Sequence, residues 1–179
     1  MWILIIGAIV LWAVFIFNRL VSLRARVKAA WSDIDVQLRR RHDLIPVLVD
    51  AVKNYMAYER ATFEAVTAAR EAAMTAGRDV ASRATAESRL TEALSVLLAR
   101  VEAYPALRAS KNALGLQEEL TSTENRIAFA RQHFNDCVMS YNTKIGSFPA
   151  VLIAGRTGFQ AEPFFQIDEA QRVPVGVKL

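Results

Sequence analysis

The sequence predicts an all-α protein in which an N-terminal transmembrane helix continues into an antiparallel bundle of long helices. Three observations predict this fold. Residues 1–17 carry no charged side chain, the chain that follows is rich in Ala, Leu, Arg and Glu, and most of the seven Gly and five Pro come after residue 145. Because Gly and Pro disfavour helix interiors, long helices are expected over most of the chain.

Residues 1–23 are expected to form a membrane anchor. The uncharged stretch from Met1 to Phe17 spans about 25 Å as a helix, close to the roughly 30 Å of a bilayer's hydrocarbon core. The following residues complete the span if the long side chain of Arg19 reaches the headgroups. A cleaved signal peptide needs a basic segment before the apolar stretch and a small-residue cleavage site after it, and neither pattern is convincing. The sequence therefore favours an uncut anchor.

The charge distribution predicts on which side of the membrane the rest of the chain lies. From Arg19 to His42 there are seven basic and two acidic residues, a balance of +5, whereas the later residues include fifteen basic and sixteen acidic ones, a balance of −1. By the positive-inside rule this is a single-pass inner-membrane protein with its N-terminus outside and a cytoplasmic domain. Anionic lipid is also a better ligand for this segment than nucleic acid, since the later residues have no basic excess. We call its first four basic residues the basic collar: Arg19, Arg24, Arg26 and Lys28.

Residues 24–148 are expected to form the cytoplasmic bundle, beginning with an arm continuous with the anchor. Apolar residues recur every three or four positions from Leu20 to Leu38, which is the helical period. Pro46 predicts a kink rather than a stop, because the apolar pattern resumes after it. The arm is expected to reach about Thr75.

Further long helices, three to four in all, are expected to complete the bundle. A turn containing Gly77 and Asp79 precedes a helix over about 80–102. Its apolar face consists of Leu90, Leu94, Leu97, Leu98 and Val101. Tyr104 and Pro105 begin the next helix, which extends to about Ser147, since Pro is tolerated in a first turn. Its expected buried stripe is Leu107, Leu114, Leu116, Leu120, Ile127, Ala130, Phe134, Val138, Tyr141 and Ile145.

Residues 149–179 are expected to form an irregular C-terminal segment, because Gly, Pro and Phe punctuate it after Phe148 and Pro149. Its last apolar residues alternate with others in a strand-like way: Val173, Val175, Val177 and Leu179. Since no other strand is predicted, this tail packs on the bundle, joins a neighbouring subunit or stays disordered, and we favour the first two.

The chain lacks the common patterns of catalytic and cofactor-binding sites. Neither His42 nor His133 follows a Glu at the spacing that di-iron sites of helical bundles use. No HExxH motif, paired Cys ligands, Gly-rich phosphate loop or nucleophile elbow occurs. The single cysteine, Cys137, has apolar helical neighbours and is expected to be a small buried core residue. We therefore expect no enzyme activity and no catalytic residue, cofactor or metal.

A line of polar residues follows the last predicted long helix beside its apolar stripe. We call Glu124, Arg131, Asn135 and Asn142 the polar ladder, because their separations of seven, four and seven place them on one helix face. Its expected partners on other helices are Arg40, Arg41, Asp43, Glu59 and Arg70. Two interpretations stay open: the pairs set the register of the helices, or part of the ladder faces another subunit and rejects wrong partners.

These residues belong to two groups of motifs. The first group is Trp31, Arg40, Arg41, Asp43, Leu44, Ile45, Pro46, Leu48, Val49, Glu59, Ala69 and Arg70. The second is Tyr104, Pro105, Leu107, Leu116, Gln117, Leu120, Thr123, Glu124, Asn125, Arg126, Ile127, Ala130, Arg131, Asn135, Tyr141, Asn142, Phe148, Pro149 and Phe159. In order and spacing they resemble the LemA family, with departures at Val47, Ala113 and Phe134. The resemblance implies a bacterial membrane protein with a short outer N-terminus, a cytoplasmic antiparallel helical domain and no established enzymatic activity.

The sequence leads to one main hypothesis and two alternatives for function. The main hypothesis is a membrane scaffold that forms a large homo-oligomer, because an anchored helical stalk carries Ala-rich faces that permit close approach. These alanines are Ala61, Ala65, Ala68, Ala69, Ala72 and Ala73. The first alternative is a tethered adaptor that recruits another membrane protein or senses anionic lipid through the basic collar. The second is a helical-bundle enzyme whose acids form no recognised pattern.

Overall fold

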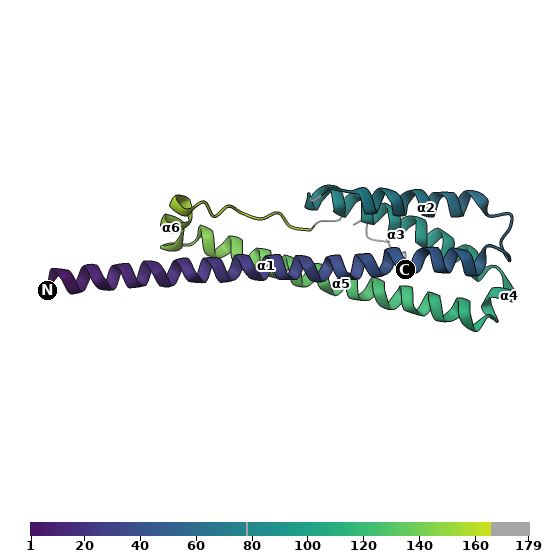
Figure 1. Cartoon of the computed structure of the whole chain (residues 1–179), viewed down its shortest axis with the longest axis horizontal. Helices are drawn as coiled ribbons and strands as arrows, with labels where there is room; N and C mark the ends of the chain where they lie inside the picture. Colours follow the sequence, from purple (N-terminus) through teal and green to yellow (C-terminus); the bar gives the residue numbers. More distant parts are fainter. Residues whose placement is uncertain (78, 166–179) are drawn as a thin grey trace, which may run out of the picture. The chain divides into compact units, whose positions relative to one another are not determined.

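The computed structural model of this protein describes residues 1–77 and 79–165, and every regular element in them is a helix (Figure 1). The helices are α1 (Trp2–Val52), α2 (Arg60–Thr75), α3 (Val80–Glu102), α4 (Pro105–Arg108), α5 (Lys111–Gly146) and α6 (Ala150–Thr157). The all-α prediction is therefore confirmed. The chain forms two compact units: unit 1 contains residues 1–36 and 127–164, and unit 2 contains residues 37–126 together with Phe165.

Helix α1 begins in the apolar N-terminus and continues without a break into the following arm, as the sequence predicted, and it ends at Val52. All large apolar side chains up to Phe15 are exposed, and the least exposed of them, Ile5, is still 47% exposed. Burial begins at Ile16 and recurs at Leu20. In the described part of the chain, α1 is the one helix long and apolar enough to cross a membrane. This exposed apolar surface is consistent with a single membrane anchor.

Unit 1 packs α6 and the second part of α5 against α1. Trp31 of α1 and Phe134 of α5 are in ring contact, with their centroids 5.3 Å apart. Nearer the N-terminus, Ile16 and Leu20 are buried together with two alanines of α6. The apolar positions of α1 that the sequence analysis identified therefore do face a protein core.

Unit 2 has the larger apolar core, and the first arm that leads into it is shorter than predicted. Helix α1 continues past Pro46, as expected, but it ends at Val52, and α2 begins only at Arg60. The prediction of one arm reaching Thr75 is therefore wrong. Met56 lies in the intervening turn and is completely buried. It continues the apolar spacing of α1 although it is not part of a helix. After this turn, α2 runs beside α3 (Figure 1).

The predicted bounds of α3 are confirmed, and a side-chain cap explains its start. The backbone N–H and the hydroxyl of Ser82 each donate to the carboxylate of Asp79 at 2.8 Å. These two hydrogen bonds lower the pKa of Asp79 from its ordinary value. In the usual N-cap arrangement, an acidic side chain just before a helix accepts a hydrogen bond from a backbone N–H of the first turn, as Asp79 does here.

The next predicted helix is interrupted near its start, which changes its buried face. The chain forms the short α4 up to Arg108 and begins α5 only at Lys111. Because the break resets the helical phase, Leu114 is 41% exposed and Ala113 is buried in its place. The prediction that Leu114 is buried is therefore wrong.

After Pro149, the described residues 150–165 form one short helix, α6, followed by a stretch without regular structure. Gly158 ends this helix in the left-handed region, with φ of 76°, where an L side chain would be strained. The segment was expected to be irregular, and α6 is the part that differs. Its end, with the alternating Val173, Val175, Val177 and Leu179, lies outside the described residues.

Candidate functional site

The strongest concentration of buried charge lies in unit 2 around Arg41 of α1. Arg41 and Glu87 of α3 are fully buried, and His42 is 5% exposed. Such groups are almost never fully buried unless they are paired. We call this group, with the two residues that complete its contacts, the Arg41 cluster: Arg41, His42, Glu87, Thr91 and Glu124.

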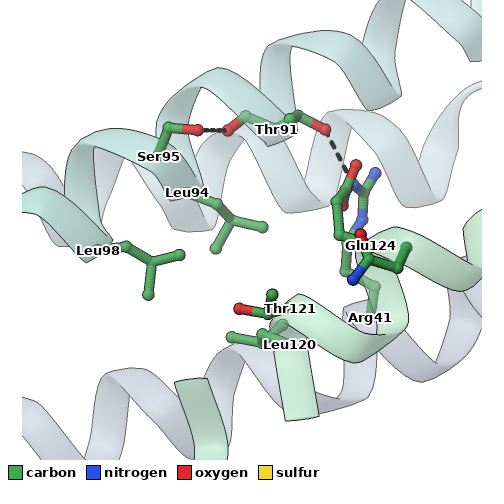
Figure 2. A pocket seen from close by; sticks show the side chains of 9 residues that line it. Arg41, Thr91, Leu94, Ser95, Leu98, Leu120, Thr121 and Glu124 are labelled. Carbon is green, nitrogen blue, oxygen red and sulfur yellow. Dashed lines mark hydrogen bonds and ion pairs between the residues drawn. The ribbon is translucent and has the colours of Figure 1, made fainter. Parts of the chain in front are cut away.

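The guanidinium of Arg41 connects three helices through its two terminal nitrogens. Its Nη2 donates to Oε2 of Glu87 on α3. Its Nη1 donates to Thr91 Oγ1 on α3 at 2.9 Å and to Glu124 Oε2 on α5 at 2.6 Å. Figure 2 shows Thr91 and Glu124 converging on Arg41. His42 Nε2 lies 3.1 Å from the other carboxylate oxygen of Glu87, an ion-pair distance without the alignment of a hydrogen bond.

The helical phase of α1 and α3 explains why these charged residues point inward. Arg41 lies between the buried residues Leu38 and Ile45, three and four positions away. Glu87 lies three positions after the buried Ala84 and three before the buried Leu90. Residues at such spacings share one helix face, so both charges belong to the core-facing stripe of their helix.

The environment of Glu87 makes the stability of unit 2 depend on pH. Burial alone raises the pKa of Glu87, but His42 and Arg41 outweigh burial and hold the pKa below its ordinary value of 4.5. A group with such a lowered pKa stabilises the fold fully above its unfolded pKa, and this stabilisation disappears as the pH falls through the folded pKa. We expect the urea concentration at the midpoint of unfolding to decrease when the pH is lowered below about 4.5, and to decrease less in Glu87→Gln. If the urea midpoints of both proteins decreased equally with pH, Glu87 would not be the cause of the pH dependence.

A pocket of about 170 Å³ lies beside the Arg41 cluster (Figure 2). Leu94, Leu98 and Leu120 form its apolar wall. The three hydroxyl groups that line it, of Thr91, Ser95 and Thr121, each donate to the backbone carbonyl four residues earlier in their own helix, at 3.1, 2.9 and 2.9 Å. In residues 1–77 and 79–165 no group of three or more His, Cys, Asp or Glu is placed to hold a metal. The contacts therefore favour the interpretation that these charges set the register of the helices.

A second polar contact involves Pro46 and Arg70. Proline has no N–H, so the carbonyl of His42, four residues earlier in α1, loses its helical donor. Arg70 of α2 replaces that donor: its Nε donates to the carbonyl oxygen of His42 at 2.7 Å. Arg70 was expected to pair with the polar ladder, and the structure places it instead on the backbone of α1.

Other motif residues make separate contacts within one unit. Arg40 donates to Glu119 at 2.7 Å on the exposed surface of unit 2. Glu59, before α2, accepts from the hydroxyl of Tyr104 at 3.4 Å and lies 3.5 Å from Arg100. Of the residues expected to meet the polar ladder, Arg41 is the one that binds Glu124.

Asn142, at the end of the polar ladder, attaches the chain after α6 to α5. Its Nδ2 donates to the carbonyl of Glu162 at 2.9 Å, and its Oδ1 accepts from the N–H of Glu162 at 3.0 Å. The side-chain amide of Asn142 thus pairs with both backbone polar groups of Glu162. The remaining ladder residues, Arg131 and Asn135, are half-buried.

The other predicted site residues differ in exposure. Tyr141 is buried, and Tyr104 and Pro149 are half-buried. Exposed are the basic collar residues Arg19, Arg24, Arg26 and Lys28, and also Asp43, Pro46, Pro105 and Phe148. The collar is therefore accessible to a ligand.

Cys137 is half-buried rather than in the core. Its Sγ lies 3.8 Å from Nε2 of His133, and both residues line a pocket of about 290 Å³ with Arg19 and Arg26. Burial raises the pKa of the thiol, although Arg26 opposes this effect. The helical spacing of its neighbours was compatible with either exposure, so the prediction of a buried core residue is wrong.

Sequence reasoning did not identify Glu87 or Thr91. The signal for Glu87 was present, because it shares the face of Leu90 and Leu94, where a charge needs a partner. The signal for Thr91 was absent, since a threonine hydroxyl is common on helix surfaces and bonds its own helix there.

Comparison with known proteins gives consistent relatives over most of the chain. The family model described as the LemA family matches residues 30–179. Magnetosome protein MamQ of Magnetospirillum gryphiswaldense is 24% identical over 184 residues. The match covers 89% of this chain and 68% of that protein. Magnetosome protein MamQ 1 of Paramagnetospirillum magneticum has the same identity and coverage. Protein LemA of Metamycoplasma hominis is 26% identical over 158 residues, which cover 88% of this chain and 72% of that protein.

Proposed function

Because this chain belongs to the LemA family, which has no known catalytic activity, we propose that it is a membrane-anchored scaffold that self-associates on the cytoplasmic face of the membrane. The observation that carries the proposal is α1, in which one unbroken helix joins an exposed apolar N-terminus to the packed helices of the bundle. An apolar surface of that length suits lipid and not water. The exposed basic collar supports the cytoplasmic orientation.

Helix α2 offers a surface for self-association. Its alanines at positions 61, 65, 68 and 72 are all exposed, and their spacings of four, three and four place them on one face. Small side chains let the backbone of a second helix approach closely, which strengthens packing between helices. We propose that this face, which we call the alanine face, contacts a second copy of the chain.

Introducing charge on the alanine face is expected to break the assembly without unfolding the chain. In the double variant Ala65→Glu with Ala68→Glu, two carboxylates would be buried between subunits without partners. We expect the mass of the detergent-solubilised protein to fall to that of smaller species, while its helical circular dichroism is retained. The matched control is Ala99→Glu, an exposed alanine on α3, which should leave the mass unchanged. An unchanged mass for the double variant would exclude the alanine face as the interface.

The exposure of all four collar residues favours a second candidate function, an adaptor that senses anionic lipid. Each basic residue near an anionic surface contributes about 1 kcal/mol. In protein lacking residues 1–17, replacing Arg24, Arg26 and Lys28 by Gln is therefore expected to weaken binding to anionic vesicles by about a hundredfold. A control with three exposed basic residues of unit 2 replaced, Arg60, Arg89 and Arg108, should bind as before. Equal binding to neutral vesicles would count against this function.

A further inference from the structure

Helix α6 is held against α1 where the uncharged part of α1 ends. Ala150 and Ala154 of α6 are buried in one apolar cluster with Ile16 and Leu20 of α1. After α6, the ring of Phe159 meets the ring of Phe17 edge to face, with centroids 5.7 Å apart. The first charged residue of α1 is residue 19. These contacts therefore place α6 at the level where the apolar stretch of α1 gives way to charge.

The other side of α6 is apolar and uncovered. Val151 is 42% exposed, Leu152 is 54% exposed, and Phe148, just before the helix, is 79% exposed. Because Ala150, Ile153 and Ala154 pack on the side of α6 that faces α1, Val151 and Leu152 lie on the other side. We call Phe148, Val151 and Leu152 the α6 apolar face.

The charges around this face are those that suit a lipid headgroup region. Arg156 in the last turn of α6 is exposed, and so are Arg19 and Arg24 on α1. Residues 140–165 contain one acidic residue, Glu162, which lies 3.8 Å from Arg24. An apolar face flanked by basic residues is typical of helices that lie in the membrane interface.

We propose that the α6 apolar face inserts into the membrane interface, so that the chain contacts the bilayer through α6 as well as through the α1 anchor. This inference rests on the proposed membrane anchoring by α1. Lipid is the occupant because α6 packs beside the part of α1 that would leave the bilayer. Burial of its three side chains in lipid would fix the depth and rotation of unit 1 at the membrane surface.

The test places a fluorophore on the face in the full-length chain in vesicles of phosphatidylcholine and phosphatidylglycerol. The natural thiol is removed by Cys137→Ala, and an environment-sensitive nitrobenzoxadiazole label is attached to Leu152→Cys or Val151→Cys. Val96→Cys on α3 is the matched control, because Val96 is 53% exposed, like Leu152 at 54%. Leu11→Cys reports on the anchor itself. The quenchers are aqueous iodide and lipids that carry a nitroxide, near the headgroup for positions 151, 152 and 96 and in the acyl chain for position 11.

The labels at positions 151 and 152 are expected to show blue-shifted emission, loss of most emission with the lipid quencher and little loss with iodide. The label at position 96 should respond in the opposite way. If position 11 is quenched by lipid while positions 151 and 152 behave like position 96, the inference is overturned and the anchor stands. Protection from iodide without lipid quenching at both positions would mean that protein covers the face, which also overturns it. No lipid quenching at position 11 would refute the anchor and this inference together.

Discussion

Replacing Arg41 by methionine is expected to lower the free energy of unfolding by about 3–5 kcal/mol, the cost of breaking a buried ion pair by removing one partner. Glu87 would stay fully buried and lose the guanidinium that its carboxylate accepts from. Glu124 and Thr91 would lose a donor as well. Because small domains are stable by only about 5–15 kcal/mol, the variant should be partly unfolded at moderate denaturant. Urea unfolding followed by circular dichroism in mild detergent measures the loss.

The neighbouring arginine provides the matched control. Arg40 also forms an ion pair, with Glu119, but the two side chains are 47% and 42% exposed. Exposed pairs contribute at most about 1 kcal/mol, so Arg40→Met should have a small effect. Adding Glu87→Met to Arg41→Met removes both buried charges and should recover much of the lost stability. If Arg41→Met costs no more than Arg40→Met, the Arg41 cluster is not what holds these helices together.

Replacing Arg70 by leucine is expected to cost about 1–3 kcal/mol, because it leaves a carbonyl of α1 without a donor. The carbonyl belongs to His42, and its helical donor is missing at Pro46. The distinguishing test is the same substitution in a Pro46→Ala background, where the restored N–H satisfies the carbonyl. There Arg70→Leu should cost much less, and the two substitutions should show a coupling of about 0.5–3 kcal/mol in urea unfolding.

The control for this cycle is Arg60→Leu on the same helix. Arg60 is exposed and, among the described residues, pairs along its own helix with Glu64, so its loss should matter little in either background. Strictly additive effects of Pro46→Ala and Arg70→Leu would contradict the account, since each would then act independently of the freed carbonyl.

The parts of the fold that the sequence predicted correctly depend on local signals. The bounds of α3 follow from the Gly77 and Asp79 turn and from a regular apolar stripe. The break between α1 and α2 was missed because Met56 continues the helical spacing of apolar residues. Nothing local distinguishes an apolar residue that is buried in a turn from one that is buried on a helix. The phase of Leu114 was wrong because the helix breaks at Ala109 and restarts after Ser110. The hydroxyl of Ser110 accepts from the backbone N–H of Ala113 at 3.4 Å, a local cap that the sequence analysis did not recognise.

The candidate site was less predictable, because its pairs depend on the register between helices. Arg41 and Glu124 were both identified, but Arg41 was one of five expected partners for the polar ladder. Glu87 was missed although it shares a helix face with Leu90, because its partner Arg41 lies on another helix and side-chain spacing does not show that pairing. The bond from Arg70 to His42 was missed because its acceptor is a backbone atom, which side-chain patterns do not show.

The mass of the full-length protein in a gentle detergent, with single-particle images of the same fraction, tests the scaffold proposal most directly. Self-association predicts a large closed assembly of the intact chain and smaller species for the variant with charge on the alanine face. A monomer at high concentration, in several detergents and in nanodiscs, would contradict the scaffold and leave the adaptor as the remaining proposal.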